Sequence, residues 1–275
     1  MRRGSSDSRR FFLLFWNQVK LLARMASAVS ARSVSKSYRL SSRPFERLRE
    51  LWTRTNQSRQ FEALRNVTFD LQAGGSLALV GENGAGKSTL LKLIAGVSQP
   101  SSGELHVAGR VGALLELGSG FHPEFTGRQN AELAAALHGL SPRQIRAKLP
   151  AILEWAELGD FVDRPLRQYS TGMAMRLGFS IAVHLEPDIL VVDEALAVGD
   201  GYFQKKCLDR ILEFQRRGGT LIFCSHALYY VSTLCEEALW LREGNVEALG
   251  PAQEVVRRYE EYLLARKKTE DVSGS

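Results

Sequence analysis

Short apolar runs alternate with amphipathic helical segments along most of the 275-residue chain. Runs typical of strands cover residues 31–38, 62–71, 77–80, 106–115, 189–192, 220–224 and 238–241. Helical spacing of apolar residues is found over 89–95, 127–157 with one break at 140–142, 174–184 and 253–265. Because strands that alternate with helices form parallel sheets covered by helices, the pattern predicts an α/β fold with a mostly parallel sheet.

Two basic segments interrupt this alternation. In residues 1–30, apolar side chains recur at helical spacing among polar and basic ones, which is typical of an amphipathic helix on a membrane surface. An alternative that stays open is that translation starts at Met25. The second segment covers 39–60, where a short amphipathic helix is marked by Phe45, Leu48, Leu51 and Trp52.

These boundaries predict three parts of the chain. Residues 1–28 are an N-terminal extension, either amphipathic or artefactual. Residues 29–250 form the main domain, with a helical lobe at about 116–185, and 251–275 form a C-terminal helix and a polar tail.

Charge is unevenly distributed. Residues 1–60 carry 14 Lys and Arg against 3 Asp and Glu, a net charge of +11. The remaining residues carry 22 Lys and Arg against 27 Asp and Glu, a net charge of −5, so the whole chain has a net charge of +6. A basic segment on an acidic body suggests an anionic membrane surface or nucleic acid as the partner of that segment, and a solvated tail explains it equally well.

The cysteines and the lengths of the apolar runs indicate which cellular compartment fits this chain. Cys207, Cys224 and Cys235 show neither C-x-x-C spacing nor a histidine cluster, so neither a disulfide framework nor a zinc site is indicated, and a reducing compartment fits. The densest apolar run, 11–16, is shorter than the core of a signal peptide and far below the roughly 18 residues of a membrane-spanning helix. A transport function would need another chain to provide the membrane path.

The most specific motif lies between the run 77–80 and the helix that follows it. Residues 81–88 match the phosphate-binding pattern G-x-x-x-x-G-K-S/T at every fixed position. The glycines allow backbone N–H groups to turn toward phosphate oxygens, Lys87 would reach the β- and γ-phosphates, and Ser88 would hold Mg²⁺. A glycine turn that only caps a helix is the alternative. The expected ATP-binding set is Gly81, Asn83, Gly84, Ala85, Gly86, Lys87, Ser88 and Thr89.

An apolar strand at 189–192 ends in the carboxylates Asp193 and Glu194. Beside a phosphate loop, Asp193 would support the Mg²⁺ shell, and Glu194 would orient or deprotonate the attacking water. Without the loop, an exposed acidic strand end would explain the pair equally well.

Residues 169–173, Tyr-Ser-Thr-Gly-Met, precede the predicted helix at 174–184 and place a hydroxyl and a glycine N–H at its N-terminus. This segment resembles the signature motif of ATP-binding cassette proteins, and the resemblance covers about residues 29–262. In that superfamily two cassettes pack head to tail, so that the signature of one completes the ATP site of the other. The resemblance implies that Ser170 and Gly172 act in trans, although a simple helix cap is the alternative.

The order of further motifs fits the same superfamily. By resemblance, Asp200 lies in the dimer-contact loop, His226 is the switch histidine that senses the γ-phosphate, and Tyr38 stacks on adenine. An ordinary loop histidine and a core tyrosine are the alternatives for the last two. The implied fold is a P-loop NTPase cassette with a RecA-like parallel core, an antiparallel β subdomain and an inserted helical lobe.

One element departs from the general pattern. At the start of the helical lobe the superfamily has a glutamine that contacts Mg²⁺ and the transmembrane partner, and Glu116 is the nearest candidate for this metal role. Gln129 comes too late in the chain. The segment 114–128 instead resembles the branch that exports bacterial surface polysaccharides, namely O-antigen, capsule and teichoic acid.

The sequence therefore predicts an ATP-hydrolysing subunit of an exporter of lipid-linked surface polysaccharide, with ATP and Mg²⁺ as cofactors and catalysis by Lys87, Glu194 and His226. We expect a homodimer at the cytoplasmic face of the inner membrane, a separate permease subunit, and no nucleic-acid partner. The alternatives are a cassette for a lipid or drug, and a soluble cassette ATPase outside transport.

Overall fold

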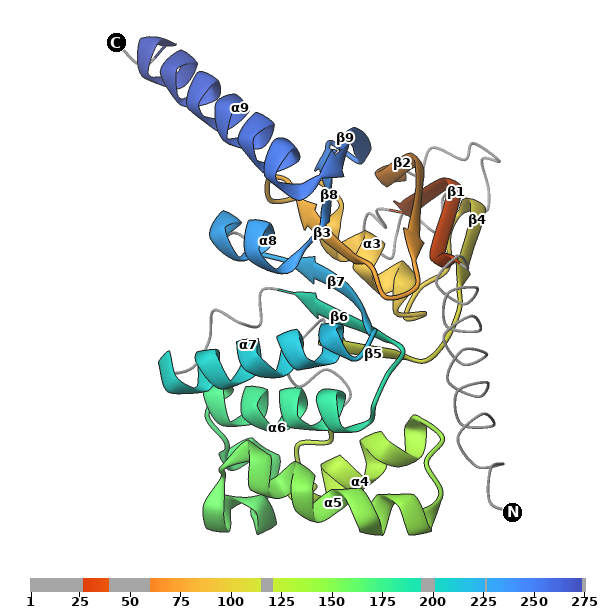
Figure 1. Ribbon diagram of the computed structural model, residues 1–275, viewed down its shortest axis with the longest axis vertical. Coiled ribbons are helices and arrows are strands. Elements are labelled where there is room, and N and C mark those ends of the chain that lie inside the picture. Colours follow the sequence, from red (N-terminus) through yellow and green to blue (C-terminus); the bar gives the residue numbers. More distant parts are fainter. Residues whose placement is uncertain (1–26, 40–59, 115–120, 194–200, 226, 274–275) are drawn as a thin grey trace, which may run out of the picture. The chain divides into compact units, whose positions relative to one another are not determined.

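The computed structural model describes residues 27–39, 60–114, 121–193, 201–225 and 227–273 (Figure 1). They fall into two compact units. The first takes its residues from Met1–Ser30, Asp70–Ser76 and His106–Ile222, and the second from Ala31–Phe69, Leu77–Leu105 and Phe223–Ser275.

The first unit contains three neighbouring strands, in the order β5 (Val111–Leu114), β6 (Ile189–Asp193) and β7 (Thr220–Cys224). β5 and β6 pair in parallel, with Val111 opposite Ile189. All of β7 and the first four residues of β6 are buried. Continuous burial without alternation is typical of parallel strands that are covered on both faces.

The helices of the first unit include a three-helix cluster formed by α4 (Gly127–Leu137), α5 (Pro142–Ala156) and α6 (Thr171–His184) (Figure 1). Two short 3₁₀ helices, η1 (Gly159–Asp163) and η2 (Leu166–Gln168), connect α5 to α6, and α7 (Gly201–Arg216) follows β6. The cluster shares one core, made of Ala131, Ala135, Leu149, Ile152, Leu153, Ala156, Leu158, Leu177, Ile181 and Leu185.

The predicted break between α4 and α5 is confirmed, and its cause is local. Ser141 accepts a hydrogen bond from the backbone N–H of Gln144, whose side chain accepts one in return from the Ser141 N–H. Pro142 occupies the first helical position, where a missing N–H costs no hydrogen bond.

The second unit contains two sheet segments. In one, β3 (Ser76–Val80), β8 (Glu237–Arg242) and β9 (Asn245–Pro251) are neighbours in that order, with β3 and β8 parallel and β8 and β9 antiparallel. The other is a three-stranded sheet in the order β2 (Gln60–Gln72), β1 (Ser27–Arg39) and β4 (Ser102–Val107). Among the described residues of this unit, the helices are α3 (Lys87–Ile94), α8 (Leu228–Leu234) and α9 (Ala252–Ser273).

The predicted fold class is confirmed, because the molecule combines parallel strands, an antiparallel sheet and helices. The prediction of a single strand over 106–115 was wrong, because this part of the chain contains the end of β4 and all of β5. Between them Gly109 adopts φ +111°, and the N–H of Arg110 donates to the Asp188 carboxylate over 2.8 Å. A glycine at positive φ turns the chain at this point.

The sequence patterns missed β9 and underestimated α9. The turn before β9 has two consecutive residues at positive φ, Glu243 at +49° and Gly244 at +82°, which is the backbone of a tight antiparallel hairpin. α9 extends from Ala252 to Ser273, whereas apolar spacing predicted a helix only as far as residue 265. Among the residues that the structure describes, none of the helices has the length and apolarity needed to cross a membrane.

Candidate nucleotide-binding site

The loop between β3 and α3 belongs to the second unit and is built on three glycines at positive φ. Gly81, Gly84 and Gly86 have φ of +145°, +81° and +107°. A Cβ on Gly81 would lie 2.3 Å from the carbonyl oxygen of Leu241, and one on Gly86 would lie 2.6 Å from that of Ala63. At Gly84 a Cβ would meet no atom of the described residues within 4 Å. Backbone packing therefore explains two of these glycines, whereas none of the described residues crowds Gly84.

Lys87 is buried, and its ammonium group forms hydrogen bonds with the backbone of the loop. Its Nζ donates to the carbonyl oxygens of Gly81, over 2.7 Å, and Glu82, over 3.0 Å. A buried ammonium held by uncharged carbonyls is a cation that an anion can recruit at small cost. The loop thus has the charge and the backbone shape that fit a phosphate group.

The N-terminus of α3 adds partial positive charge next to this loop. Gly86 is the N-cap residue and contributes no side chain there, while Ser88 on the first turn is exposed. Helix N-terminal N–H groups carry partial positive charge, which favours anions. The hairpin of β8 and β9 supports the loop, because the N–H of Gly244 donates to the carbonyl oxygen of Ala85 over 3.1 Å.

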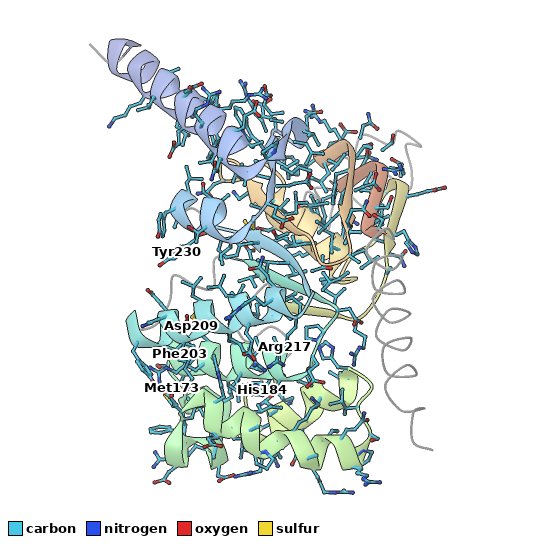
Figure 2. All side chains as sticks on the ribbon, in the orientation of Figure 1. Met173, His184, Phe203, Asp209, Arg217 and Tyr230 are labelled. Atoms are coloured by element: carbon cyan, nitrogen blue, oxygen red, sulfur yellow. The ribbon has the colours of Figure 1, made fainter. Side chains whose placement is uncertain are left out.

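A second helix N-terminus carries predicted site residues in the first unit. Ser170 caps α6, and its hydroxyl accepts a hydrogen bond from the Met173 N–H over 3.2 Å. A Cβ on Gly172 would lie 3.9 Å from the Ser170 hydroxyl. The two residues border an open pocket of about 300 Å³, whose lining consists of Glu157, Leu158, Phe161, Ser170, Gly172, Met173 and Arg176. In Figure 2, Met173 lies at one end of α6 and His184 at the other.

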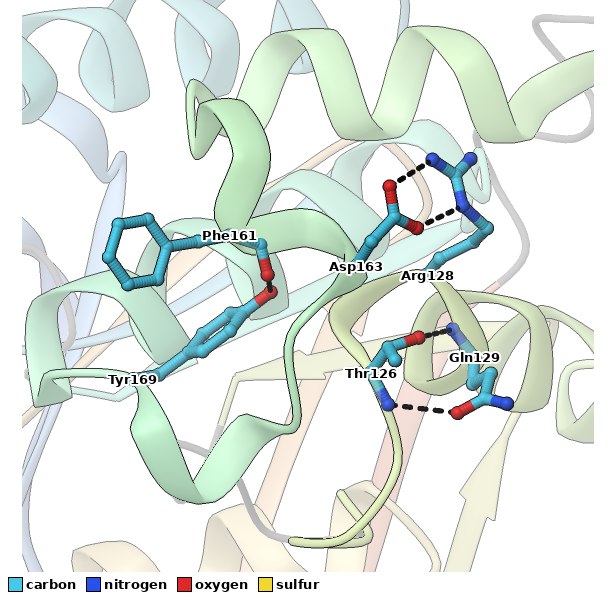
Figure 3. Close-up of polar contacts among 6 residues, drawn as sticks. All are labelled: Thr126, Arg128, Gln129, Phe161, Asp163 and Tyr169. Atoms are coloured by element: carbon cyan, nitrogen blue, oxygen red, sulfur yellow. Dashed lines mark hydrogen bonds and ion pairs between the residues drawn. The ribbon is translucent and has the colours of Figure 1, made fainter.

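Tyr169 fixes the segment that precedes Ser170 (Figure 3). Its hydroxyl donates a 2.6 Å hydrogen bond to the carbonyl oxygen of Phe161. Arg128 of α4 pairs with Asp163 at the end of η1, with Nε 2.7 Å from Oδ1. Burial raises the pKa of Tyr169 above its usual value.

A charged network that the sequence patterns missed lies one helical turn beyond the signature segment, residues 169–173. Glu157 follows α5 in a left-handed conformation, with φ +53°. Its carboxylate pairs with Lys206 of α7 and lies 3.9 Å from a guanidinium nitrogen of Arg176 on α6. The guanidinium of Arg176 lies 4.8 Å from the ring centre of Phe203. No motif signals this network, because its members are scattered along the sequence.

Asp193 ends β6 at the carboxyl edge of the first unit's strands and is half-buried. Its position agrees with a role at the exit of a parallel strand, where ligand sites of α/β sheets lie. Within the described part of the chain, no three His, Cys, Asp or Glu side chains gather as a metal site. A hydroxyl and a carboxylate are nevertheless the oxygen donors that Mg²⁺ takes together with phosphate oxygens, so Ser88 and Asp193 fit that ion chemically.

Comparison with known proteins decides the family. The family model described as ABC transporter matches residues 64–197. The O-antigen export ATP-binding protein RfbB of Klebsiella pneumoniae is 44% identical over 207 residues, which cover 75% of this chain and 84% of the relative. The chain belongs to the ABC transporter family. The predicted recognition of an ABC ATP-binding subunit is confirmed, and so is its class as an ATP hydrolase.

Two further comparisons extend this ABC assignment. The teichoic acids export ATP-binding protein TagH of Bacillus anthracis is 43% identical over 235 residues, and these cover 86% of this chain but only 43% of that relative. A solved dimeric ATP-binding cassette in a post-hydrolysis state, bound to ADP and phosphate, has a TM-score of 0.68. It is 21% identical and covers 82% of this chain and 98% of its own, so this likeness shows the ABC fold.

Several ABC motif residues predicted from the sequence lie outside the described residues, namely Glu116, Glu194, Asp200 and His226. Tyr38 is described, at the end of β1 in the second unit. The residue is 38% exposed, and the Lys36 ammonium lies 5.3 Å from the centre of its ring. The exposed ring leaves adenine stacking by Tyr38 as a prediction, whereas burial in a core, the alternative, is not observed.

Proposed function

We propose that this chain is the ATP-hydrolysing subunit of an exporter of lipid-linked surface polysaccharide. It works as a homodimer at the cytoplasmic face of the membrane, beneath a separate membrane-spanning permease. The observation that carries the nucleotide part is the phosphate loop, with its glycines at positive φ and the buried ammonium of Lys87. The export part is supported by relatives named for O-antigen and teichoic acid export.

Within this proposal the loop residues bind the triphosphate. Backbone N–H groups of residues 83–89 surround phosphate oxygens, and the exchange of carbonyl partners for phosphate brings the Lys87 charge to the β- and γ-phosphates. Ser170 and Gly172 act on the ATP of the other cassette, and Tyr38 stacks on adenine. Asp200 contacts the partner cassette, Glu194 orients the attacking water, and His226 senses the γ-phosphate.

Ser88 and Asp193 would hold Mg²⁺, with Glu116 as a further candidate. When bound, Mg²⁺ neutralises charge on the β- and γ-phosphate oxygens. The chain's own contribution is to keep the Ser88 hydroxyl exposed at the first turn of α3 and the Asp193 carboxylate at the end of a buried strand.

ATP turnover by purified variants tests the nucleotide part. Glu194→Gln is expected to retain ATP binding and lose turnover, whereas Lys87→Ala is expected to lose most of both. Arg146→Ala, which removes an exposed cation from α5, serves as the control and should change neither quantity. Normal steady-state hydrolysis by Glu194→Gln would refute the role of that carboxylate.

Co-purification tests the export part. The chain is expressed with and without a candidate membrane-spanning permease, and the purified material is analysed for lipid-linked glycan. A stable ATP-hydrolysing complex that carries glycan supports the proposal. A complex that carries another lipid or a drug-like molecule favours a different transport substrate, and an active dimer that ignores the membrane protein favours a cassette outside transport.

A further inference from the structure

The C-terminal helix α9 contacts the phosphate loop through the side chain of Glu82, the residue after the first glycine of the loop. The hydroxyl of Tyr262 donates to one carboxylate oxygen of Glu82 over 2.9 Å, and the guanidinium of Arg266 pairs with the other. All three residues belong to the second unit. The side chain of Glu82 is 33% exposed and that of Arg266 is 48% exposed, so water shields this pair only in part.

Tyr262 is held in position by packing, independently of Glu82. Its ring centre lies 5.3 Å from that of Trp240 on β8 and 6.4 Å from that of Tyr259, and the guanidinium of Arg242 lies 4.9 Å from it. Trp240 and Tyr259 are both buried. Because the aromatic contacts and the cation hold the ring, they direct the hydroxyl toward the loop without help from its hydrogen bond to Glu82.

Glu82 also contacts the residue that supplies the positive charge of the loop. Its backbone carbonyl accepts hydrogen bonds from the Lys87 ammonium, over 3.0 Å, and from the Ala85 N–H, over 3.2 Å. A free carboxylate on a loop that binds phosphate would repel the ligand and attract Lys87. Arg266 offsets that charge, and Tyr262 fixes the direction in which the carboxylate points.

We propose that Tyr262 and Arg266 are positioning residues for ATP: by holding and neutralising Glu82, they keep its carboxylate away from the triphosphate and set the affinity of the phosphate loop. The inference rests on ATP binding at this loop, as proposed above. It makes α9 part of the nucleotide site, although α9 lies about 180 residues beyond the loop in the sequence. A contact that only stabilised the fold would leave the affinity of the folded protein for ATP unchanged.

The test measures the dissociation constant for a fluorescent ATP analogue, together with the KM and kcat for ATP, on the full chain. Arg266→Ala is expected to weaken nucleotide binding and raise KM about two- to fivefold, the size expected when a partly exposed ion pair is lost, with kcat changed by less than about twofold. Tyr262→Phe keeps the aromatic cluster and should give a smaller shift in the same direction.

The decisive measurement repeats the Arg266→Ala substitution in a protein that lacks the Glu82 carboxylate. In the Glu82→Gln background there is no carboxylate to neutralise, so adding Arg266→Ala should leave the dissociation constant unchanged. In a protein that retains Glu82, the effect of Arg266→Ala should shrink at high salt, because exposed charges are screened.

Arg257→Ala is the matched control, because Arg257 lies on the same helix and pairs with Glu261 instead of the loop. If Arg266→Ala binds ATP as tightly as Arg257→Ala does, or if its weaker binding persists in the Glu82→Gln background, the proposed role is overturned. Failure of the proposed function looks different, because the unsubstituted chain and Lys87→Ala would then bind ATP equally poorly.

Discussion

The α-carbon of Gly127 lies so close to the hydroxyl of Tyr169 that a Cβ on Gly127 would come within 2.1 Å of that oxygen. The contact joins the first turn of α4 to Tyr169, the first residue of the segment 169–173. We expect Gly127→Ala to lower the free energy of unfolding by about 1–3 kcal/mol, because the Tyr169 ring must move and a well-packed site must absorb extra volume. Urea unfolding measures the change.

Tyr169→Phe provides the control for this clash. The double variant Gly127→Ala/Tyr169→Phe lacks the hydroxyl that meets the new methyl group, so it should lose less stability than the sum of the two single variants. Simple additivity would show that the destabilisation has another origin. Tyr169→Phe alone also removes the 2.6 Å hydrogen bond to Phe161, which is worth about 1 kcal/mol.

The two helix caps of the first unit separate stability from function. Ser170 caps α6 and Ser141 caps α5, and in each the hydroxyl accepts a backbone N–H three residues later. Substitution of either serine by Ala should cost about 1 kcal/mol of stability. Of the two variants, only Ser170→Ala should also lower ATP turnover per folded chain, because Ser170 borders the open pocket and Ser141 does not. Equal turnover by the two variants would show that Ser170 acts as a helix cap and has no role in ATP turnover.

Local chemistry explains why much of the fold could be predicted from the sequence. The buried strands β6 and β7 are continuous apolar runs. The break between α4 and α5 follows from Ser141, which caps α5, and from Pro142 at the first position of that helix. The hairpin strand β9 was missed because its exposed and buried residues give a weak apolar signal, and its turn begins with Glu243, a residue that seldom adopts positive φ.

The phosphate loop was predicted for a similar reason, since its pattern is contiguous and each glycine has a conformational cause. The contacts of Tyr262 and Arg266 with Glu82 could not be predicted, because tertiary folding alone brings α9 to the loop. The same holds for Glu157, whose partners Arg176 and Lys206 come from two other helices. Long-range ion pairs leave no periodic trace in a single sequence.

Two glycines of the phosphate loop should respond differently to alanine. At Gly86 the methyl group would meet the Ala63 carbonyl oxygen at 2.6 Å and a Leu64 methyl at 2.7 Å, in addition to the strain of φ +107°. Gly86→Ala should therefore lower the free energy of unfolding by more than about 2 kcal/mol. At Gly84 none of the described residues would meet the methyl group, so Gly84→Ala should cost the positive-φ strain alone, about 1–2 kcal/mol. Urea unfolding of both variants, measured side by side, checks this order.

The buried thiols predict a loss of stability in alkali. Burial raises the pKa of Cys207 and of Cys235 from 9.0 to about 12. The folded state therefore binds more protons than the unfolded state between these values, so the stabilisation is complete below pH 9 and is lost as the pH rises toward 12. At pH 8 both thiols should resist a thiol reagent in the folded protein and react once urea unfolds it.

Replacement of these cysteines isolates their share of the alkaline loss. Lysine and tyrosine side chains also titrate in this range, so the informative quantity is the difference between the original chain and a Cys207→Ala/Cys235→Ala variant. The variant starts from a lower stability at pH 8 because two buried side chains are truncated, and its urea midpoint should fall less between pH 8 and pH 10.5. Parallel declines of the two proteins over that interval would show that the buried thiols make no contribution to the pH dependence.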